Sequence, residues 1–205
     1  RKGGVAMAAI GACAGFGAIC GSSLATAATM GKVALPELRR LGYSGALSTG
    51  TLAAGGTLGI LIPPSVILII YSILTEQNIA KMFLAAFIPG ILAALGYILA
   101  IALYVRFVKG SGPTKNRIGW KERLSLFKSI WQIILIFLVM IGGIYLGWFT
   151  PTEGGAIGAG GAGLIAISSK NFKFKDLVDV IESTAITSAM IFLVLLGAEF
   201  FNSFI

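Results

Sequence analysis

The stretch Gly50–Tyr71, GTLAAGGTLGILIPPSVILIIY, is long and apolar enough to cross a membrane, but its middle is interrupted. Pro64 has no N–H, and its ring clashes with the carbonyl group four residues before it; Pro63 is pushed out of the helical region by the proline that follows. A continuous helix is therefore not expected. Because broken helices in a membrane occur where they are buried in protein or line a polar cavity, this break predicts a binding site.

The composition of the whole chain predicts an integral membrane protein. Of its 205 residues, 57% are hydrophobic and only 12% are charged, and the mean hydropathy is +0.93. Apolar runs such as 84–105 and 130–147 approach or reach the roughly 20 residues that one crossing requires. We therefore expect an all-α, polytopic fold in a lipid bilayer.

The formal net charge of +8 does not indicate a nucleic-acid partner, because the basic residues gather in short segments between apolar runs. Such clusters mark the cytoplasmic side of a membrane protein. The loops expected to be cytoplasmic are 32–43, 106–128 and 168–177. The second is the strongest signal, with seven basic residues and one acidic residue.

The N-terminal part predicts a re-entrant helical hairpin. A first apolar arm runs over Gly4–Cys20, and a second arm over Leu24–Leu35 is only about 18 Å long, too short to cross a core of about 30 Å. Its tip carries hydroxyl groups and a turn with exposed backbone groups, formed by Gly21, Ser22 and Ser23, with Thr26 just beyond. The alternative is that these small residues serve only close helix packing.

The interrupted segment Gly45–Leu74 is too long for one straight crossing, so a break over Gly55–Ser65 would divide it into two half-helices. The hairpin tip and this break are expected to meet near mid-membrane, where neutral oxygens suit a hard cation such as Na⁺ and the N–H groups of a half-helix suit a carboxylate. The expected Na⁺ ligands are Ser22, Ser23, Gly56 and Thr57.

The remaining chain predicts further membrane helices over about 80–105, with a kink at Pro89–Gly90, and over 129–148, 154–167 and 177–201. Thr150 or Thr152 is expected to cap the helix that follows Glu153. The organisation is then 1–42 (hairpin and loop), 43–75 (broken helix of a first repeat), 76–128 (helix and basic loop) and 129–205 (start of a second repeat, three helices).

Catalysis is not expected. The chain has no histidine, no pair of intramembrane carboxylates and no Walker motif, so the sequence predicts no enzyme and no cofactor, with an ion gradient as the energy source. Cys13 and Cys20 lie in an apolar stretch without a CxxC motif and are expected to be free thiols.

Four segments carry a family resemblance: CGSSLATAATMG (20–31), LPELRRLGY (35–43), LAAGGTLGILIPPS (52–65) and IYLGWFTPTE (144–153). They resemble the large, DctM-like membrane subunit of tripartite ATP-independent periplasmic (TRAP) transporters, of which this chain looks like an internal fragment. The resemblance implies an Na⁺-driven, inverted-repeat elevator importer of organic acids such as C4-dicarboxylates or sialic acid, in the bacterial inner membrane. It also implies two partners, a small four-helix DctQ-like membrane subunit and a periplasmic DctP-like solute-binding protein.

Carried over to this sequence, the resemblance assigns the first-repeat half of the Na⁺ and substrate region to the hairpin tip and the broken helix. The residues are Gly21, Ser22, Ser23, Thr26, Gly55, Gly56, Thr57, Gly59, Pro63, Pro64 and Ser65. The second hairpin and second broken helix are expected outside this segment. Two other hypotheses stay open: a binding-protein-independent symporter of similar architecture, and a structural membrane subunit without transport activity.

Overall fold

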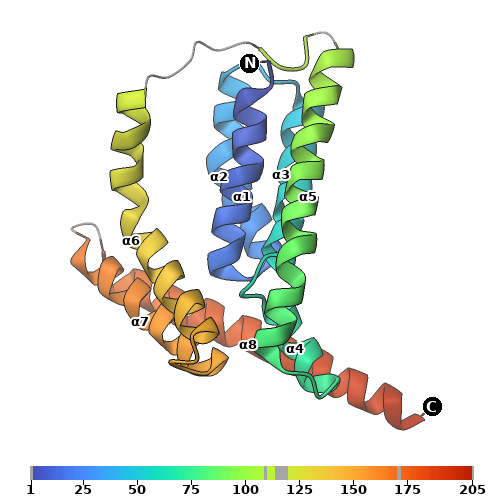
Figure 1. The fold of residues 1–205 in the computed structure, drawn as a ribbon, viewed down its shortest axis with the longest axis vertical. Coiled ribbons are helices and arrows are strands. Elements are labelled where there is room, and N and C mark those ends of the chain that lie inside the picture. The colour runs from blue at the N-terminus through green and yellow to red at the C-terminus, as the bar shows by residue number, and fades with distance from the viewer. Residues whose placement is uncertain (1, 109, 114–119, 170–171, 205) are drawn as a thin grey trace. The chain divides into compact units, whose positions relative to one another are not determined.

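The computed structural model describes residues 2–108, 110–113, 120–169 and 172–204, without the side chains of 120–130 and 202. All regular structure in these residues is helical (Figure 1). The helices are α1 Gly4–Cys20, α2 Ser23–Arg40, α3 Gly45–Leu61, α4 Val66–Leu74, α5 Ile79–Phe107, α6 Trp120–Tyr145, α7 Pro151–Ser168 and α8 Phe174–Phe204.

A two-residue turn joins α1 and α2 into a hairpin, and the two helices lie side by side (Figure 1). The turn forms because Gly21 adopts the left-handed conformation that ends α1, with φ of 60°. Its N–H donates to the carbonyl oxygen of Gly17 at 2.8 Å. Ser22 then caps α2, its side chain accepting a hydrogen bond from the N–H of Ala25 at 3.3 Å.

The second arm of the hairpin is longer than its sequence suggested. The prediction that it ends at Leu35 is wrong, because α2 continues through Pro36 to Arg40. Leu38 is only 1% exposed, so burial of an apolar side chain holds the last turn in place. An ion pair between Arg40 and Glu37 at 2.7 Å lies on the same turn. The predicted loop 32–43 is thereby reduced to the residues after Arg40.

The interruption between α3 and α4 is confined to residues 62–65, and the two helices are bent by 42°. The prediction that the break begins at Gly55 is wrong, because α3 runs on through Gly55, Gly56 and Thr57 to Leu61. The helix ends only where two successive prolines remove backbone N–H donors. Glycine alone costs a helix about 1 kcal/mol, which packing in α3 offsets.

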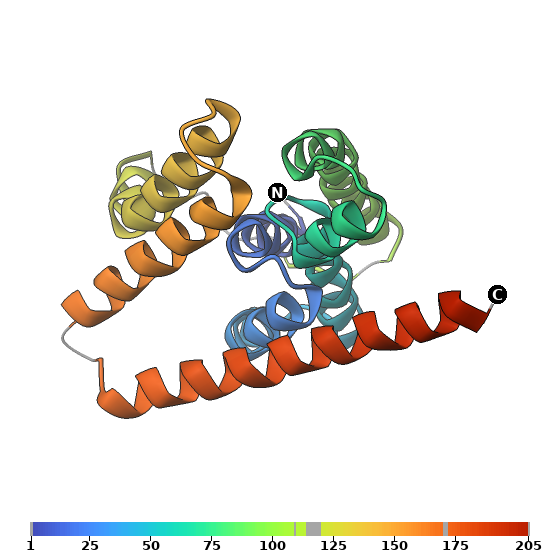
Figure 2. The same ribbon diagram turned by 90° about the horizontal axis from the view of Figure 1, so that it is seen from below.

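A hydrophobic core forms where α1, α2, α3 and α5 pack together as a bundle, which Figure 2 shows end-on. It contains buried apolar side chains from all four helices, among them Ile10, Met30, Leu58 and Ile101. α5 is a single helix of 29 residues that continues through Pro89, and Asn78 caps it by accepting from the N–H of Lys81 at 3.0 Å.

Two predicted loops are shorter than expected. α6 begins at Trp120, so residues 120–128 of the expected loop 106–128 are helical, and α8 begins at Phe174, inside the expected loop 168–177. Helix formation by these flanking residues extends both helices beyond their most apolar runs. The basic residues Lys109, Lys115, Arg117 and Lys170 lie outside the described residues.

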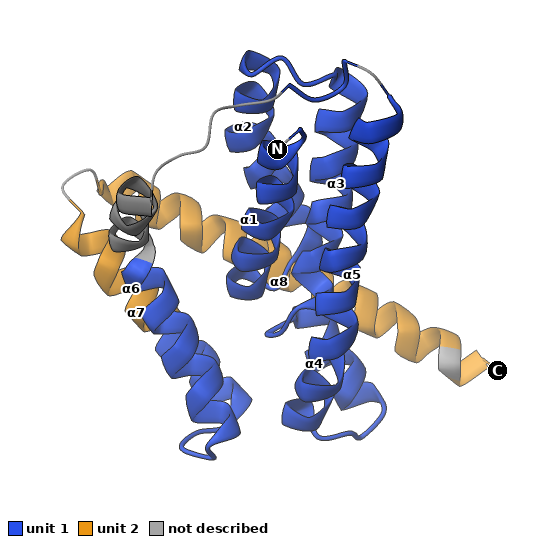
Figure 3. Cartoon of the chain, turned by 45° about the horizontal axis from the view of Figure 1, so that its top comes forward, with its two compact units in different colours: residues 1–158 blue, residues 159–205 orange. Residues whose placement is uncertain are grey.

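The chain divides into two compact units, residues 1–158 and 159–205 (Figure 3). In the described residues, the helices long and apolar enough to cross a membrane are Ile79–Phe107 in the first unit and Phe174–Phe201 in the second. The bent pair α3 and α4 gives a third candidate if it forms one span. These helices agree with the expectation of an all-α integral membrane protein.

Candidate functional site

The hairpin tip and the helix break touch each other directly through their main chains. The N–H of Val66, at the start of α4, donates to the carbonyl oxygen of Gly21 at 3.3 Å. A Cβ on Gly21 would lie 2.7 Å from the carbonyl oxygen of Pro64 and 3.3 Å from the Cα of Ser65. Both its positive φ and this close approach therefore require glycine at position 21.

Glycines on α3 bring the helix equally close to both arms of the hairpin. A Cβ on Gly59 would lie 2.6 Å from Thr26 Oγ1 and 2.7 Å from the carbonyl oxygen of Ser22. On Gly56 it would lie 2.7 Å from the Cβ of Ala27, and on Gly55 it would lie 2.7 Å from Cys13 Sγ. These glycines are therefore packing positions of the α3 surface that faces the hairpin.

The hydroxyl groups of Ser22 and Thr26 are engaged within the hairpin tip itself. Thr26 is fully buried, and its Oγ1 donates to the carbonyl oxygen of Ser22 at 2.8 Å. Cys20 Sγ lies 3.1 Å from the same Oγ1. Ser23, the first residue of α2, is half-buried. Ser22 and Thr26 thus hold the shape of the tip, and the carbonyl oxygen of Gly21 is the one that accepts a hydrogen bond from the start of α4.

Ser65 differs from these hydroxyl groups because its Oγ is buried without a partner. The residue is 1% exposed, and no group in the described part of the chain forms a hydrogen bond with its Oγ. It stands at the N-cap of α4 without making a capping bond. Leaving a buried hydroxyl unpaired costs about 1–3 kcal/mol, so Ser65 is the polar group at the break that is suited to a ligand.

The break also leaves main-chain oxygens without their usual donors. Pro63 and Pro64 have no N–H to give to the carbonyl oxygens of Gly59 and Ile60, the acceptors four residues earlier. Neutral oxygens are thus concentrated at the junction. Within the described residues no group of three or more His, Cys, Asp or Glu side chains could hold a metal ion, so any cation at this junction would depend on neutral oxygens.

The structure does not bring Thr57 together with the hairpin tip. Its Oγ1 donates to the carbonyl oxygen of Ala54 at 2.7 Å and lies 2.9 Å from the hydroxyl oxygen of Tyr97 on α5. One residue along a helix corresponds to a rotation of about 100°, so Gly56 faces α2 while Thr57 faces α5. Tyr97 was not expected at this site, and its position in an apolar run offered no signal beyond helical spacing.

A cavity of about 290 Å³ lies on the same side of α3, between α1, α3 and α5. Its lining is almost entirely apolar and includes Ile10, Thr51, Tyr97 and Tyr104. Thr51 is buried, and its Oγ1 has no hydrogen-bond partner in the described residues. Beside this cavity, the α3–α5 contact is therefore looser than the glycine contacts between α3 and the hairpin.

Two further predictions are confirmed, for the cap of α7 and for the two cysteines. Thr150 caps α7: its Oγ1 accepts from the N–H of Glu153 at 3.3 Å, while Glu153 Oε2 accepts from the N–H of Thr150 at 2.7 Å. These bonds, the backbone bond first, lower the pKa of Glu153. Cys13, which is buried, and Cys20, which is half-buried, are both free thiols.

Long apolar helices, a helical hairpin and an interrupted helix lined by neutral oxygens define an integral membrane protein with features of a permease. Residues 1–205 match the family described as tripartite ATP-independent periplasmic transporter, DctM component, and the chain belongs to that family. The predicted resemblance is confirmed.

Relatives carry the same family name and differ in their named substrates. The chain is 39% identical to the C4-dicarboxylate TRAP transporter large permease protein DctM of Vibrio cholerae, over 86% of this chain and 38% of that protein. It is 34% identical to the sialic acid TRAP transporter permease protein SiaT of Haemophilus influenzae, over 99% of this chain and 33% of that protein. It is 32% identical to the ectoine TRAP transporter large permease protein TeaC of Halomonas elongata, over 97% of this chain and 47% of that protein.

These comparisons confirm that the chain belongs among transporter permease subunits and not among enzymes. The chain spans about two fifths of the length of the DctM relatives from Vibrio cholerae and Pseudomonas aeruginosa.

Proposed function

We propose that this chain forms part of the membrane subunit of an Na⁺-coupled secondary active importer of organic acids. A periplasmic binding protein would deliver the substrate, and a small DctQ-like membrane subunit would complete the complex. The observation that carries this proposal is the junction of Gly21 with the α3–α4 break, where the buried Oγ of Ser65 has no partner. Hairpin tips that meet interrupted helices are where secondary transporters place their sites.

The chemistry of the junction suits both a cation and an anion. The carbonyl oxygens that the prolines leave without donors, with the hydroxyl of Ser65, offer the neutral oxygen ligands that hard cations prefer. The N–H of Val66 is taken by Gly21, but the next N–H groups in the first turn of α4 have no partner within the helix and could face a carboxylate, and the helix dipole favours negative charge there. Na⁺ and an organic acid would thus stabilise each other at one place.

The mechanism and orientation form part of the same proposal. With its 18 residues, α2 is about 27 Å long and still short of a core of about 30 Å, so the α1–α2 hairpin would be re-entrant, with its tip in the membrane interior. The hairpin would move with α3 and α4 in an elevator-like transition within the bacterial inner membrane. The basic segments around Arg40, Arg106 and Lys173 would face the cytoplasm. The substrate would be an organic acid such as a C4-dicarboxylate or sialic acid, in line with the names of the relatives.

The test is Na⁺-dependent uptake by the full-length protein with both partners in proteoliposomes. Ser65→Ala removes the unpaired hydroxyl and should raise the Na⁺ concentration for half-maximal uptake by about tenfold or more, since a hydrogen-bonding group facing a charge contributes ~1.5–3 kcal/mol. Ser72→Ala is the matched control, because Ser72 Oγ lies in the same helix and already donates to the carbonyl oxygen of Leu68 at 2.6 Å. An unchanged Na⁺ dependence in Ser65→Ala would contradict the proposed site.

The two alternatives give different results in the same preparation. A binding-protein-independent symporter would transport at full rate when the solute-binding protein is omitted. A structural subunit would show no Na⁺-stimulated uptake under any combination of partners. Our proposal requires uptake that depends on both the binding protein and Na⁺.

A further inference from the structure

The C-terminal end of α5 meets the start of the chain at a specific packed contact. Gly3 has φ of 73°, and a Cβ on it would lie 3.0 Å from Cγ2 of Val105. Val105 is buried, and Gly112 packs against the same Cγ2, at 3.1 Å from the position of its own added Cβ. Lys2 precedes Gly3 and Arg106 follows Val105. The contact therefore brings together two basic residues that lie about 100 positions apart in the sequence.

Lys2 and Arg106 line one hollow of about 280 Å³, together with Ala102 and Val105. Neither basic side chain forms an ion pair with a carboxylate in the described part of the chain, whereas Arg40 pairs with Glu37. The hollow is therefore a positively charged opening with apolar side chains beside it. Its charge is complementary to a phosphate group.

An exposed apolar stripe runs along α5 directly away from this hollow. Counting back from Arg106 in steps of three or four residues gives one helix face, on which every side chain is apolar and between 46% and 68% exposed. At 1.5 Å per residue this face extends for about 22 Å, comparable to one leaflet with its head group. The stripe consists of Leu103, Leu99, Leu95, Leu92 and Ile88.

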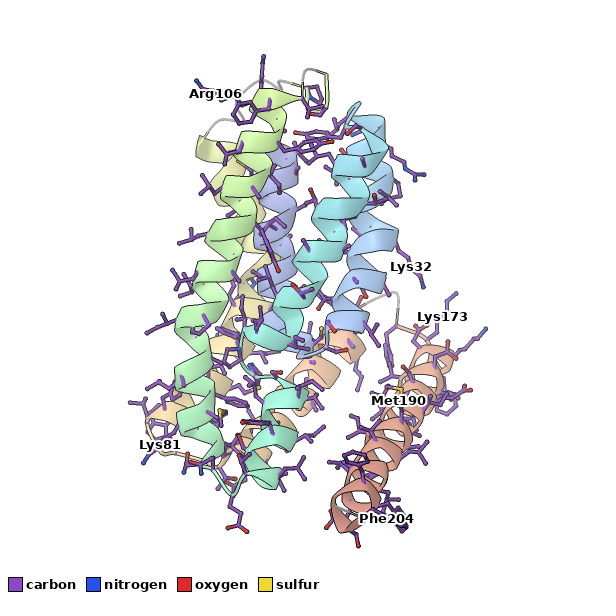
Figure 4. All side chains as sticks on the ribbon, turned by 90° about the vertical axis from the view of Figure 1, so that its right-hand side faces the viewer. Lys32, Lys81, Arg106, Lys173, Met190 and Phe204 are labelled. Atoms are coloured by element: carbon purple, nitrogen blue, oxygen red, sulfur yellow. The ribbon has the colours of Figure 1, made fainter. Side chains whose placement is uncertain are left out.

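We propose that the Lys2–Arg106 hollow and this stripe form a binding site for an anionic phospholipid, with its phosphate between the two basic side chains and an acyl chain along α5. Charge complementarity selects an anion, and the stripe selects a lipid over a soluble phosphate. Arg106 and Lys81 mark the opposite ends of α5 (Figure 4), which places Arg106 at the membrane interface of a candidate span. This site is separate from the junction of the hairpin with the helix break.

The experiment is lipid binding by the detergent-solubilised full-length protein with its small membrane partner, measured by native mass spectrometry. Phosphatidylglycerol is titrated against phosphatidylcholine with the same acyl chains, and the wild-type protein should prefer phosphatidylglycerol. Each basic side chain near an anionic lipid contributes about fivefold in affinity, so the Lys2→Gln/Arg106→Gln double variant should lose about 25-fold.

Lys81→Gln is the matched control, because it removes one charge from the other end of the same helix and should leave the preference intact. Circular dichroism melting checks that the variants fold alike. Glycerol 1-phosphate at millimolar concentration should fail to displace the lipid. The proposal is overturned if the double variant keeps the wild-type preference, if Lys81→Gln weakens it equally, if the soluble phosphate displaces the lipid, or if the complex with the small subunit binds no phosphatidylglycerol.

Discussion

The backbone of Gly59 in α3 lies so close to Gly17 in α1 that a Cβ on Gly17 would be 2.6 Å from the Cα of Gly59. No side chain separates the two helices at this point. Close approach of backbones increases van der Waals contact, which is the main source of helix association in a membrane, where burial of apolar surface contributes little. The contact lies immediately beside the hairpin tip and fixes its distance from the helix break.

Gly17→Ala should therefore destabilise the bundle. The new methyl group would meet main-chain atoms of α3, which have no rotamer to adopt, and overpacking of this kind costs about 1–3 kcal/mol. The measurement is thermal or denaturant unfolding in detergent, followed by circular dichroism. Gly15→Ala is the control, since no atom lies within 4 Å of a Cβ at that position of the same helix, and its stability should be unchanged or slightly higher.

Gly56→Ala should show the same effect on the other arm of the hairpin, and here a rescue is available. The nearest atom is the Cβ of Ala27, at 2.7 Å, so adding Ala27→Gly removes the shortest contact and leaves the Cα of residue 27 at 3.2 Å. The Gly56→Ala/Ala27→Gly double variant should lose at least ~1 kcal/mol less free energy of unfolding than the sum of the losses in the two single variants. Gly50→Ala in the open part of α3 should be tolerated. Strictly additive effects at positions 27 and 56 would contradict the contact.

Thr57 and Tyr97 should behave as a coupled pair in a double-mutant cycle. Their oxygens lie 2.9 Å apart across the α3–α5 contact, and a hydrogen bond of this kind contributes about 0.5–1.5 kcal/mol. Thr57→Val and Tyr97→Phe should each destabilise the protein, and the double variant should cost less than their sum. If Thr57 instead coupled energetically to Ser22, its position facing α5 would be incorrect.

The cap of α7 should weaken in acid. Hydrogen bonds from Thr150 lower the pKa of Glu153, so the carboxylate contributes stability above the pKa it has in the unfolded chain, and this contribution is lost as pH falls through its lower folded pKa. Unfolding measured between pH 7 and pH 3 should show wild type and Glu153→Gln converging at the acid end. Thr152→Ala should follow the wild-type profile, since the hydroxyl of Thr152 makes no capping bond in the described structure.

Local chemistry made part of this architecture predictable. The bounds of α1 and the free state of both thiols follow from residues that act within one segment. The cap at Thr150 follows in the same way. Pro36 was misleading because its local tendency to end a helix is outweighed by the burial of Leu38, a tertiary contact that no spacing rule reveals.

The candidate site was predictable as a place but not as a set of roles. The sequence alone does not distinguish a glycine that interrupts a helix from one that allows a neighbouring backbone to approach. Gly55 and Gly56 were therefore predicted in the break, although they belong to a packed helix. The directions in which the side chains of Thr57 and Ser65 point depend on how α3 and α4 are rotated about their axes, and this rotation is set by the helices packed against them. Only coordinates distinguish the hydroxyl that is bonded to Tyr97 from the one that has no partner.

A contact between main-chain atoms cannot be relieved by a change of side-chain rotamer, and this has a mechanical consequence for the hairpin. Sliding α1 along α3 would force Gly17 and Gly59 through each other. In contrast, Thr57 of α3 meets Tyr97 of α5 through side chains, and a cavity of about 290 Å³ lies between α1, α3 and α5. The first three helices are therefore expected to behave as one rigid body, and shear within this bundle would fall on the surface that α5 shares with α1 and α3. A force applied to the hairpin tip would be transmitted to the α3–α4 bend without being absorbed on the way.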